Sequence, residues 1–246
     1  MPHEQVIIRT ADGDCPTRIV TPEGSGPWPA VIVYMDALGM RPAIVKVAER
    51  LAANGYLALL PDLFYRSGDY HIPTPKEAFA TGDLMAIIGP HMALTGPLKA
   101  AEDTRYLLEY LDTRSDVKGA KIGTVGFCMG GGMALAAAGT FPDRVAAAAS
   151  YHGGGIASDK PDSPHLLAPR MKGEIYVAGA DQDPSYPPEM AERMEEALSD
   201  AGVKHRAEIY PGALHGWMKP DFPIYDEVSA ERGWREMLAL FKRNLG

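Results

Sequence analysis

The sequence has only two cysteines among its 246 residues, Cys15 and Cys128, and they lie far apart in the chain. This excludes a small fold stapled by disulfides, and a cytosolic setting with free thiols is the simplest interpretation. No run of about 18 apolar residues occurs, so we expect no transmembrane helix. The first residues also lack the basic and then apolar pattern of a secretory signal. These absences predict a cytoplasmic chain that does not associate with membranes.

Positive charge is also scarce. Lys and Arg number 24 against 32 Asp and Glu, which gives a formal net charge of −8 at pH 7. Binding to nucleic acid requires clustered Lys and Arg that neutralise phosphates, and no such cluster is present. No two histidines have a metal-ligand spacing such as His-x3-His. We therefore expect no nucleic-acid partner, no metal and no cofactor.

The chain does contain an alternation of strand-like apolar runs and helical stripes. It has no internal repeat and no low-complexity tract, so we expect a single domain over residues 1–246. The alternation predicts an α/β fold with a mostly parallel sheet and helices on both faces. The alanines of 145–150 would also suit a helix. The predicted strands are 6–10, 17–20, 30–35, 56–60, 121–125, 145–150, 174–178 and 207–210, and the predicted helices are 44–51, 104–111, 131–138, 190–201 and 234–241.

Residues 62–97 interrupt this alternation. They show little periodicity and contain several prolines and glycines. Loops of this length are uncommon unless they are functional. The segment follows the carboxyl end of a predicted strand, which is where open α/β sheets bind ligands. We therefore predict that it forms a wall of the active site rather than a separate domain.

The most informative stretch is Gly-Phe-Cys-Met-Gly at 126–130. An apolar run leads into it and a helix of small residues leaves it, which is the context of a nucleophile elbow. The glycines fit because the turn residue is strained and its neighbours must be small. The dipole at the helix N-terminus would stabilise a thiolate on Cys128. The pattern predicts an α/β-hydrolase fold with a cysteine nucleophile, and a buried, inert cysteine is the alternative.

A base and an acid have candidates at the expected places. His215 lies in a turn-rich loop between the last strand and the last helix, and α/β-hydrolases place nucleophile, acid and histidine in that chain order. The acid should follow strand 174–178, where Asp181 and Asp183 both qualify. We favour Asp183 because Pro187 stands four residues later and leads into a helix. Either aspartate could instead be a turn residue bonded to its own backbone.

Two backbone N–H groups are predicted to form the oxyanion hole, those of Met129 and of Ala37 in the loop after strand 30–35. Tyr151 and His152 follow the strand after the elbow helix, so their side chains are predicted to line the pocket. Trp217 is predicted to form a pocket wall beside the base. The alternative for His152 is a structural histidine rather than a catalytic one, and the alternative for Trp217 is simple packing.

Together these features resemble the dienelactone hydrolase family. The resemblance rests on Gly-Phe-Cys-Met-Gly-Gly at 126–131, on Asp183, and on His215 followed by Gly-Trp. It extends to Pro-Asp-Leu-Phe at 61–64 and Met-Asp-Ala-Leu-Gly at 35–39. It implies hydrolysis of a lactone or related ester through a thiol ester, with no cofactor.

The resemblance also implies roles for three charged residues. Family members carry an acidic residue in the first oxyanion loop that contacts the nucleophile and modulates its ionisation, and Asp36 stands at that position. The best-known members bind a substrate carboxylate with arginines, one of them shortly after the histidine, where this chain has Lys219. The second comes from the variable segment, in which the nearest arginine is Arg66. Lys219 and Arg66 are therefore hypotheses for anion binding, with exposed surface charge as the alternative.

The predicted function is hydrolysis of a small lactone or carboxylic ester by Cys128, His215 and Asp183. A general carboxylesterase or thioesterase could use the same triad. A third hypothesis is a non-catalytic hydrolase-fold protein that binds a small molecule or senses oxidants through Cys128. The sequence leaves open whether the chain is a monomer or a small homo-oligomer.

Overall fold

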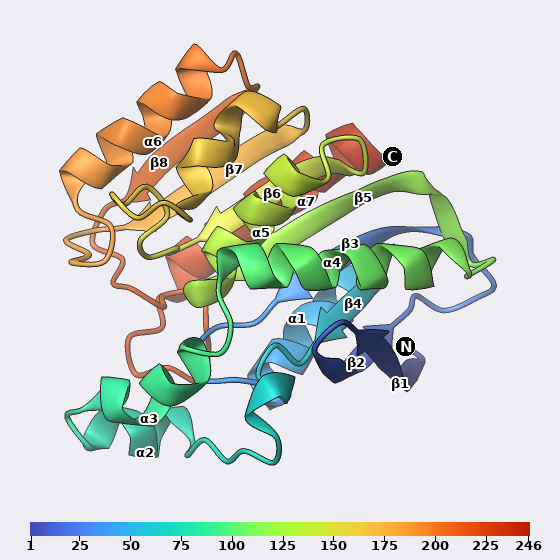
Figure 1. The fold of residues 1–246 in the computed structure, drawn as a ribbon, viewed down its shortest axis with the longest axis horizontal. Coiled ribbons are helices and arrows are strands. Elements are labelled where there is room, and N and C mark those ends of the chain that lie inside the picture. The colour runs from blue at the N-terminus through green and yellow to red at the C-terminus, as the bar shows by residue number, and fades with distance from the viewer.

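The computed structural model describes residues 1–246, and one eight-stranded sheet runs through the molecule (Figure 1). Its strands are β1 (His3–Thr10), β2 (Gly13–Val20), β3 (Trp28–Tyr34), β4 (Leu57–Pro61), β5 (Val117–Phe127), β6 (Val145–Tyr151), β7 (Glu174–Ala180) and β8 (His205–Tyr210). Their order is β1-β2-β4-β3-β5-β6-β7-β8. The pairs β1–β2 and β2–β4 are antiparallel, and all later pairs are parallel. The predicted mostly parallel α/β fold is therefore confirmed.

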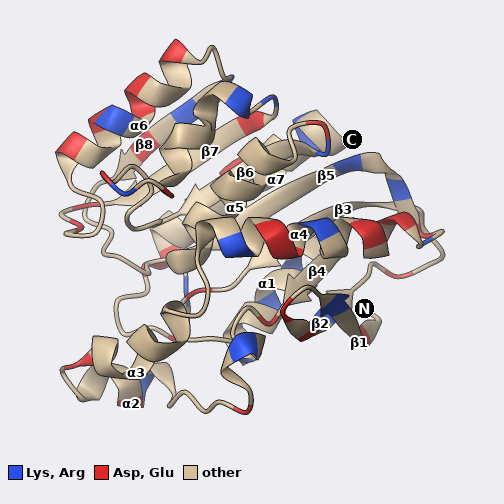
Figure 2. Cartoon of the chain, viewed as in Figure 1, with Lys and Arg blue, Asp and Glu red and all other residues tan.

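Helices cover both faces of this sheet. They are α1 (Pro42–Ala53), α2 (Pro75–Ala80), α3 (Leu84–Met92), α4 (Pro97–Asp112), α5 (Met129–Thr140), α6 (Pro188–Asp200) and α7 (Glu227–Leu245), with short 3-10 turns at Tyr65–Ser67 and Pro164–Arg170. Figure 1 shows α4 and α5 in front of the sheet, with α1 and α7 behind it. No helix combines the length and the apolar composition needed to cross a membrane. Figure 2 shows acidic and basic residues along α4 and α6, whereas α3 has none.

The sheet core is almost entirely apolar. The strands β3 and β4 are buried along nearly their whole length, because both of their faces are covered by helices. Residues 145–151 form a strand despite their run of alanines. These alanines are buried because β6 is packed between α5 on one face of the sheet and α7 on the other.

The segment 62–97 differs in part from the expectation of an irregular loop, because it contains α2 and α3. A capping box opens α2: the Thr74 hydroxyl accepts the Glu77 N–H at 3.4 Å, and the Glu77 carboxylate accepts the Thr74 N–H at 2.9 Å. Asp83 caps α3 by accepting the Ala86 N–H at 3.1 Å. Caps open both helices, and both are short, so the apolar pattern by itself is a weak signal for them.

A second, smaller apolar cluster attaches this segment to the rest of the molecule. It combines Ala78 and Ile88 of the segment with Ala37, Leu38 and Phe222 from loops at the carboxyl edge of the sheet. The rings of Phe79 and Phe222 meet edge to face with 5.2 Å between centroids. As a result, α2 and α3 stand beyond the carboxyl ends of the parallel strands, where ligands bind in this type of sheet.

Candidate active site

Cys128 occupies a sharp turn between β5 and α5. Its φ of 53° and ψ of −118° are unusual for a residue with a side chain, and such strain costs about 1–3 kcal/mol. The turn needs the flanking glycines. A Cβ on Gly126 would overlap the Gly130 carbonyl, and a Cβ on Gly130 would overlap the Tyr34 carbonyl. The local geometry is therefore that of the predicted elbow.

His215 is joined to Asp183 rather than to Asp181. Its Nδ1 lies 2.6 Å from Oδ2 of Asp183, whose side chain is almost fully buried. The hydroxyl and N–H of Ser185 donate to the other carboxylate oxygen at 2.7 and 2.8 Å. Asp181 instead accepts the Gly212 N–H at 2.8 Å. The structure therefore brings together His215 and the favoured aspartate.

The two partners shift each other's ionisation. Burial lowers the pKa of His215, but hydrogen bonds to Asp183 and to Cys128 outweigh burial and raise that pKa to about 10. Burial raises the pKa of Asp183, but the hydrogen bond from His215 and those from Ser185 outweigh it, so the net pKa lies below its usual value. A pKa this far above neutral favours the imidazolium form of His215, which is held by the ionised carboxylate of Asp183.

A cavity of about 470 Å³ lies over these residues. Its floor contains Cys128 and His215, and one wall comes from the segment 62–97, as predicted for that segment. Most of the lining is apolar. The apolar side chains that were not among the predicted site residues are Leu38, Phe79, Leu84, Met85, Ile88, Met92, Pro184 and Phe222.

Both predicted oxyanion donors lie at this cavity. Met129 and Ala37 are among its lining residues. Met129 is the first residue of α5, so its N–H has no acceptor within the helix. The N–H of Ala37 donates to no other backbone group. Both donors are therefore available to a group bound beside Cys128.

Asp36 lines the cavity, but its carboxylate is occupied. Its oxygens accept Arg41 at 2.6 and 2.9 Å, and one of them also accepts the Leu38 N–H at 3.0 Å. Arg41 is bound on its other side by Asp221 at 2.6 Å. No hydrogen bond joins Asp36 to Cys128. The contact that the resemblance implied is therefore replaced by a buried ion pair and a turn cap.

Lys219 does not reach the cavity. Its side chain is fully buried, its ammonium has no hydrogen-bond partner, and Nζ lies 3.2 Å from the centroid of the Phe127 ring. Burial lowers the pKa of Lys219 to about 7, and nearby Asp36 only partly offsets this. A substrate carboxylate cannot contact this amine without unpacking the core. The expected role in anion binding is therefore corrected.

Three aromatic residues predicted to line the pocket lie beneath it, fully buried. The Tyr151 hydroxyl donates to the Gly233 carbonyl at 2.7 Å, and Trp217 stacks on Tyr210 with 4.5 Å between centroids. His152 accepts the Cys128 N–H on Nδ1 at 3.2 Å. Burial lowers the pKa of His152 well below its usual value, so the ring is neutral. These residues support the elbow and its surroundings, but they do not line the cavity.

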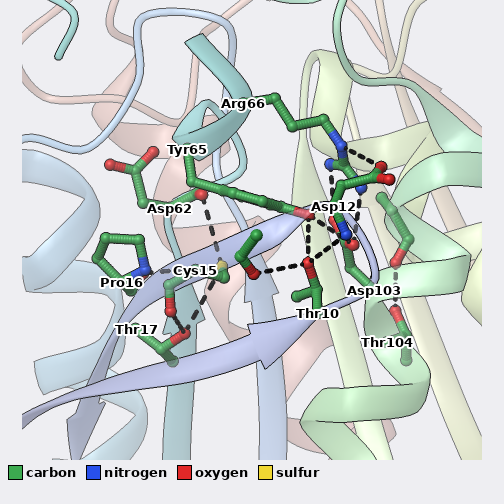
Figure 3. A network of polar contacts seen from close by, with 12 residues as sticks. Thr10, Asp12, Cys15, Pro16, Thr17, Asp62, Tyr65, Arg66, Asp103 and Thr104 are labelled. Atoms are coloured by element: carbon green, nitrogen blue, oxygen red, sulfur yellow. Dashed lines mark hydrogen bonds and ion pairs between the residues drawn. The ribbon is translucent and has the colours of Figure 1, made fainter. Parts of the chain in front are cut away.

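Arg66 is also removed from the cavity. Its guanidinium forms two hydrogen bonds of 2.8 Å with Asp103 on α4 and one of 2.7 Å with Asp12 in the β1–β2 turn. Figure 3 shows these contacts within one polar network that also includes Tyr65 and Thr10. The charge of Arg66 is therefore used to hold three parts of the chain together. Arg66 does not line the cavity, so the hypothesis that it binds a substrate anion is corrected.

Some functional candidates could have been found from the sequence. Leu84, Ile88 and Met92 follow the i, i+4, i+8 spacing of a helix face, and Thr74 and Glu77 form a capping-box pattern. Together the two patterns mark a short helical unit. Arg41 and Ser185 gave no such signal, because their roles depend on partners brought close by the fold.

The order of the sheet, the strained cysteine after β5, and the paired Asp183 and His215 after β7 and β8 define the class of α/β-hydrolases. The chain belongs to the dienelactone hydrolase family, whose profile matches residues 15–245. It is therefore a dienelactone hydrolase-like hydrolase, as the resemblance implied.

Individual relatives agree with this membership. A protein of Escherichia coli (strain K12) named "Putative carboxymethylenebutenolidase" is 32% identical over 226 residues, covering 90% of this chain and 79% of the relative. A protein of the same name from Synechocystis is 29% identical over 231 residues, covering 92% and 91%. The crystal structure titled "Putative Dienelactone Hydrolase" from Klebsiella pneumoniae has a TM-score of 0.84 and 25% identity, covering 98% of both chains.

Proposed function

We propose that Cys128 acts as nucleophile, His215 as general acid and base, and Asp183 as the carboxylate that orients His215, in the hydrolysis of small lactones or carboxylic esters. The observation that carries this proposal is the position of His215. It lies 2.6 Å from Asp183, and it lines the same cavity as Cys128. A nucleophile, a base and a group that orients the base are the parts that covalent catalysis requires.

The first half of the reaction forms a thioester. The Cys128 thiolate attacks the acyl carbonyl carbon, and the carbonyl oxygen becomes an oxyanion that accepts hydrogen bonds from the N–H groups of Met129 and Ala37. Each such donor is worth on the order of 3 kcal/mol in the transition state. The ester C–O bond then breaks, and the imidazolium of His215 gives its proton to the departing alkoxide. In a lactone the resulting alcohol stays attached to the acyl chain.

The second half returns the enzyme to its starting state. His215, now neutral, takes a proton from water as the water oxygen attacks the thioester carbonyl. The C–S bond breaks, Cys128 leaves as a thiolate, and the carboxylic acid product is released. Asp183 keeps the imidazole in one tautomer throughout and stabilises its charged form.

The decisive test compares the two cysteines. We expect Cys128→Ala to lower kcat/KM for aryl esters and lactones by about 10⁴-fold or more, because the nucleophile is lost. Cys15→Ala is the matched control. Cys15 lies on β2, is fully buried with its thiol against the Asp62 carbonyl, and is not among the residues that line the cavity. The activity of this control variant should equal that of the unmodified chain. Mass spectrometry of a rapidly quenched reaction should find the acyl group on Cys128, and undiminished turnover by Cys128→Ala would disprove the proposal.

A further inference from the structure

The cavity over Cys128 has no free positive charge. None of its lining residues is Lys or Arg, and its two carboxylates belong to Asp36 and Asp183. His215 is cationic at neutral pH, but its charge is taken by Asp183 at 2.6 Å. A carboxylate on a substrate would therefore meet two closed ion pairs, Asp36 with Arg41 and Asp183 with His215, and no unpaired cation.

The guanidinium of Arg41, which binds Asp36 at the cavity, cannot supply this charge. Arg41 is bound by Asp36 through two hydrogen bonds and by Asp221 through two more, of 2.6 and 3.3 Å. Its side chain is only 10% exposed. An anionic ligand could bind Arg41 only by displacing Asp36 or Asp221. Displacing Asp36, whose side chain is 1% exposed, would leave a buried carboxylate unpaired.

The wall opposite the elbow is apolar. The helix α3 carries no charged residue (Figure 2), and it presents Leu84, Met85, Ile88 and Met92 to the cavity. Phe79 and Phe222 extend this surface. Such a lining gains free energy by covering alkyl or aryl groups, whereas an unpaired carboxylate would lose its hydration without compensation.

From these observations, and resting on the proposed hydrolytic function, we propose that the preferred substrates are uncharged, apolar esters or lactones rather than carboxylate-bearing ones. The apolar part of the substrate lies against α3, and its reacting carbonyl faces Cys128. Specificity is thus set by the wall from residues 79–92 and by the neutralisation of Arg41.

The test uses two esters with six-carbon acyl chains that differ at the far end, p-nitrophenyl hexanoate with a methyl group and the mono-p-nitrophenyl ester of hexanedioic acid with a carboxylate. At pH 7.5 we expect kcat/KM for the neutral ester to exceed that for the anionic ester by about 100-fold or more, because burying an unpaired carboxylate is costly. Equal rates, or a faster reaction of the anionic ester, would overturn the inference while leaving the proposed function intact. Failure to cleave either ester would instead contradict the proposed function.

A charge placed at the cavity rim provides a second comparison. Met85 lines the cavity and is 60% exposed, so Met85→Lys adds an ammonium without burying it. In this variant we expect the ratio of kcat/KM for the neutral ester to kcat/KM for the anionic ester to be about tenfold lower than in the unmodified chain. Ile7→Lys is the control, because Ile7 is 58% exposed on the edge strand β1 and lies outside the cavity. An unchanged preference in Met85→Lys would count against the inference.

A binding measurement keeps the inference testable without turnover. Hexanamide and its ω-carboxylate analogue, 6-amino-6-oxohexanoate, can each be tested for protection of Cys128 against iodoacetamide. We expect hexanamide to protect Cys128 at concentrations at least about tenfold lower than those needed for the carboxylate analogue. Equal protection by the two amides would overturn the inference, whatever the enzyme hydrolyses.

Discussion

At the scale of single residues, the site depends on which carboxylate reaches His215. Asp181 and Asp183 stand two positions apart in the same loop, yet only Asp183 touches the imidazole. Ser185 fixes the carboxylate with two hydrogen bonds, so its orientation is set before any substrate binds. Because only Asp183 is held against the imidazole, substitution of Asp183 and of Asp181 should have different effects on catalysis.

We predict that Asp183→Asn lowers kcat/KM by about 10³- to 10⁴-fold, because an amide cannot stabilise the imidazolium or hold its tautomer. The pKa of His215 should fall below about 10 in the variant, since burial still lowers it and the main raising contact is lost. Steady-state kinetics and an NMR titration of His215 measure the two effects. Asp181→Asn is the control and should leave both unchanged. Equal kinetic losses in the two variants would contradict the assignment.

At the scale of elements, the segment 62–97 is joined to the sheet in two places. Its α2 and α3 dock through the small apolar cluster around Phe222, and its first turn is held by Arg66. The side chains of Arg66 and Asp103 are only 8% and 3% exposed. Removing one partner of such a pair leaves the other charge buried and unpaired.

Arg66→Met is predicted to lower the free energy of unfolding by about 3–5 kcal/mol, because Asp103 loses its counterion. The ratio of kcat/KM for the neutral and anionic esters should stay unchanged. Denaturant unfolding and the ester pair measure these outcomes. Arg9→Met is the matched control, since Arg9 and Asp14 are an exposed pair worth about 0–1 kcal/mol. A selective loss of activity on the anionic ester, without loss of stability, would restore Arg66 as a substrate ligand.

At the scale of the whole molecule, the buried amine of Lys219 links stability to pH. Its pKa is about 7 in the folded chain, against an ordinary value of 10.5. The unfolded chain therefore binds more protons between these values, and this group makes the folded state more stable as pH rises from about 7 toward 10. Below pH 7 the folded state carries the cost of a buried ammonium.

Lys219→Met should therefore be more stable than the unmodified chain at pH 6. The difference should shrink as pH rises above about 7, by up to about 1.4 kcal/mol per pH unit, because the amine of the unmodified chain is then neutral when folded. Urea unfolding at pH 6 and pH 9 measures the change. Lys242→Met, at an exposed position on α7, is the control and should give the same difference at both pH values. A difference for Lys219→Met that does not vary with pH would refute this linkage.

Several features could be predicted from the sequence because they depend on short stretches of chain. The glycines around Cys128 marked the elbow, since only small residues fit between β5, α5 and β3. Cys128, Asp183 and His215 each follow a different predicted strand. Parallel strands bring their carboxyl ends to one edge of the sheet, so these three residues could be expected to lie at the same edge. Both inferences use local backbone constraints, which the sequence expresses directly.

Charge partners were not predictable in the same way. Arg66, Lys219 and Asp36 were assigned by position, yet their contacts are with Asp103, the Phe127 ring and Arg41. An ionised side chain takes whichever counterion or packing surface the fold brings near it, and that choice joins residues up to 92 positions apart in the case of Lys219. The sequence by itself therefore determined the family, the sheet and the elbow. Only the tertiary structure decided that every cation near the cavity is already paired or buried, because neutralisation is a property of distances in space.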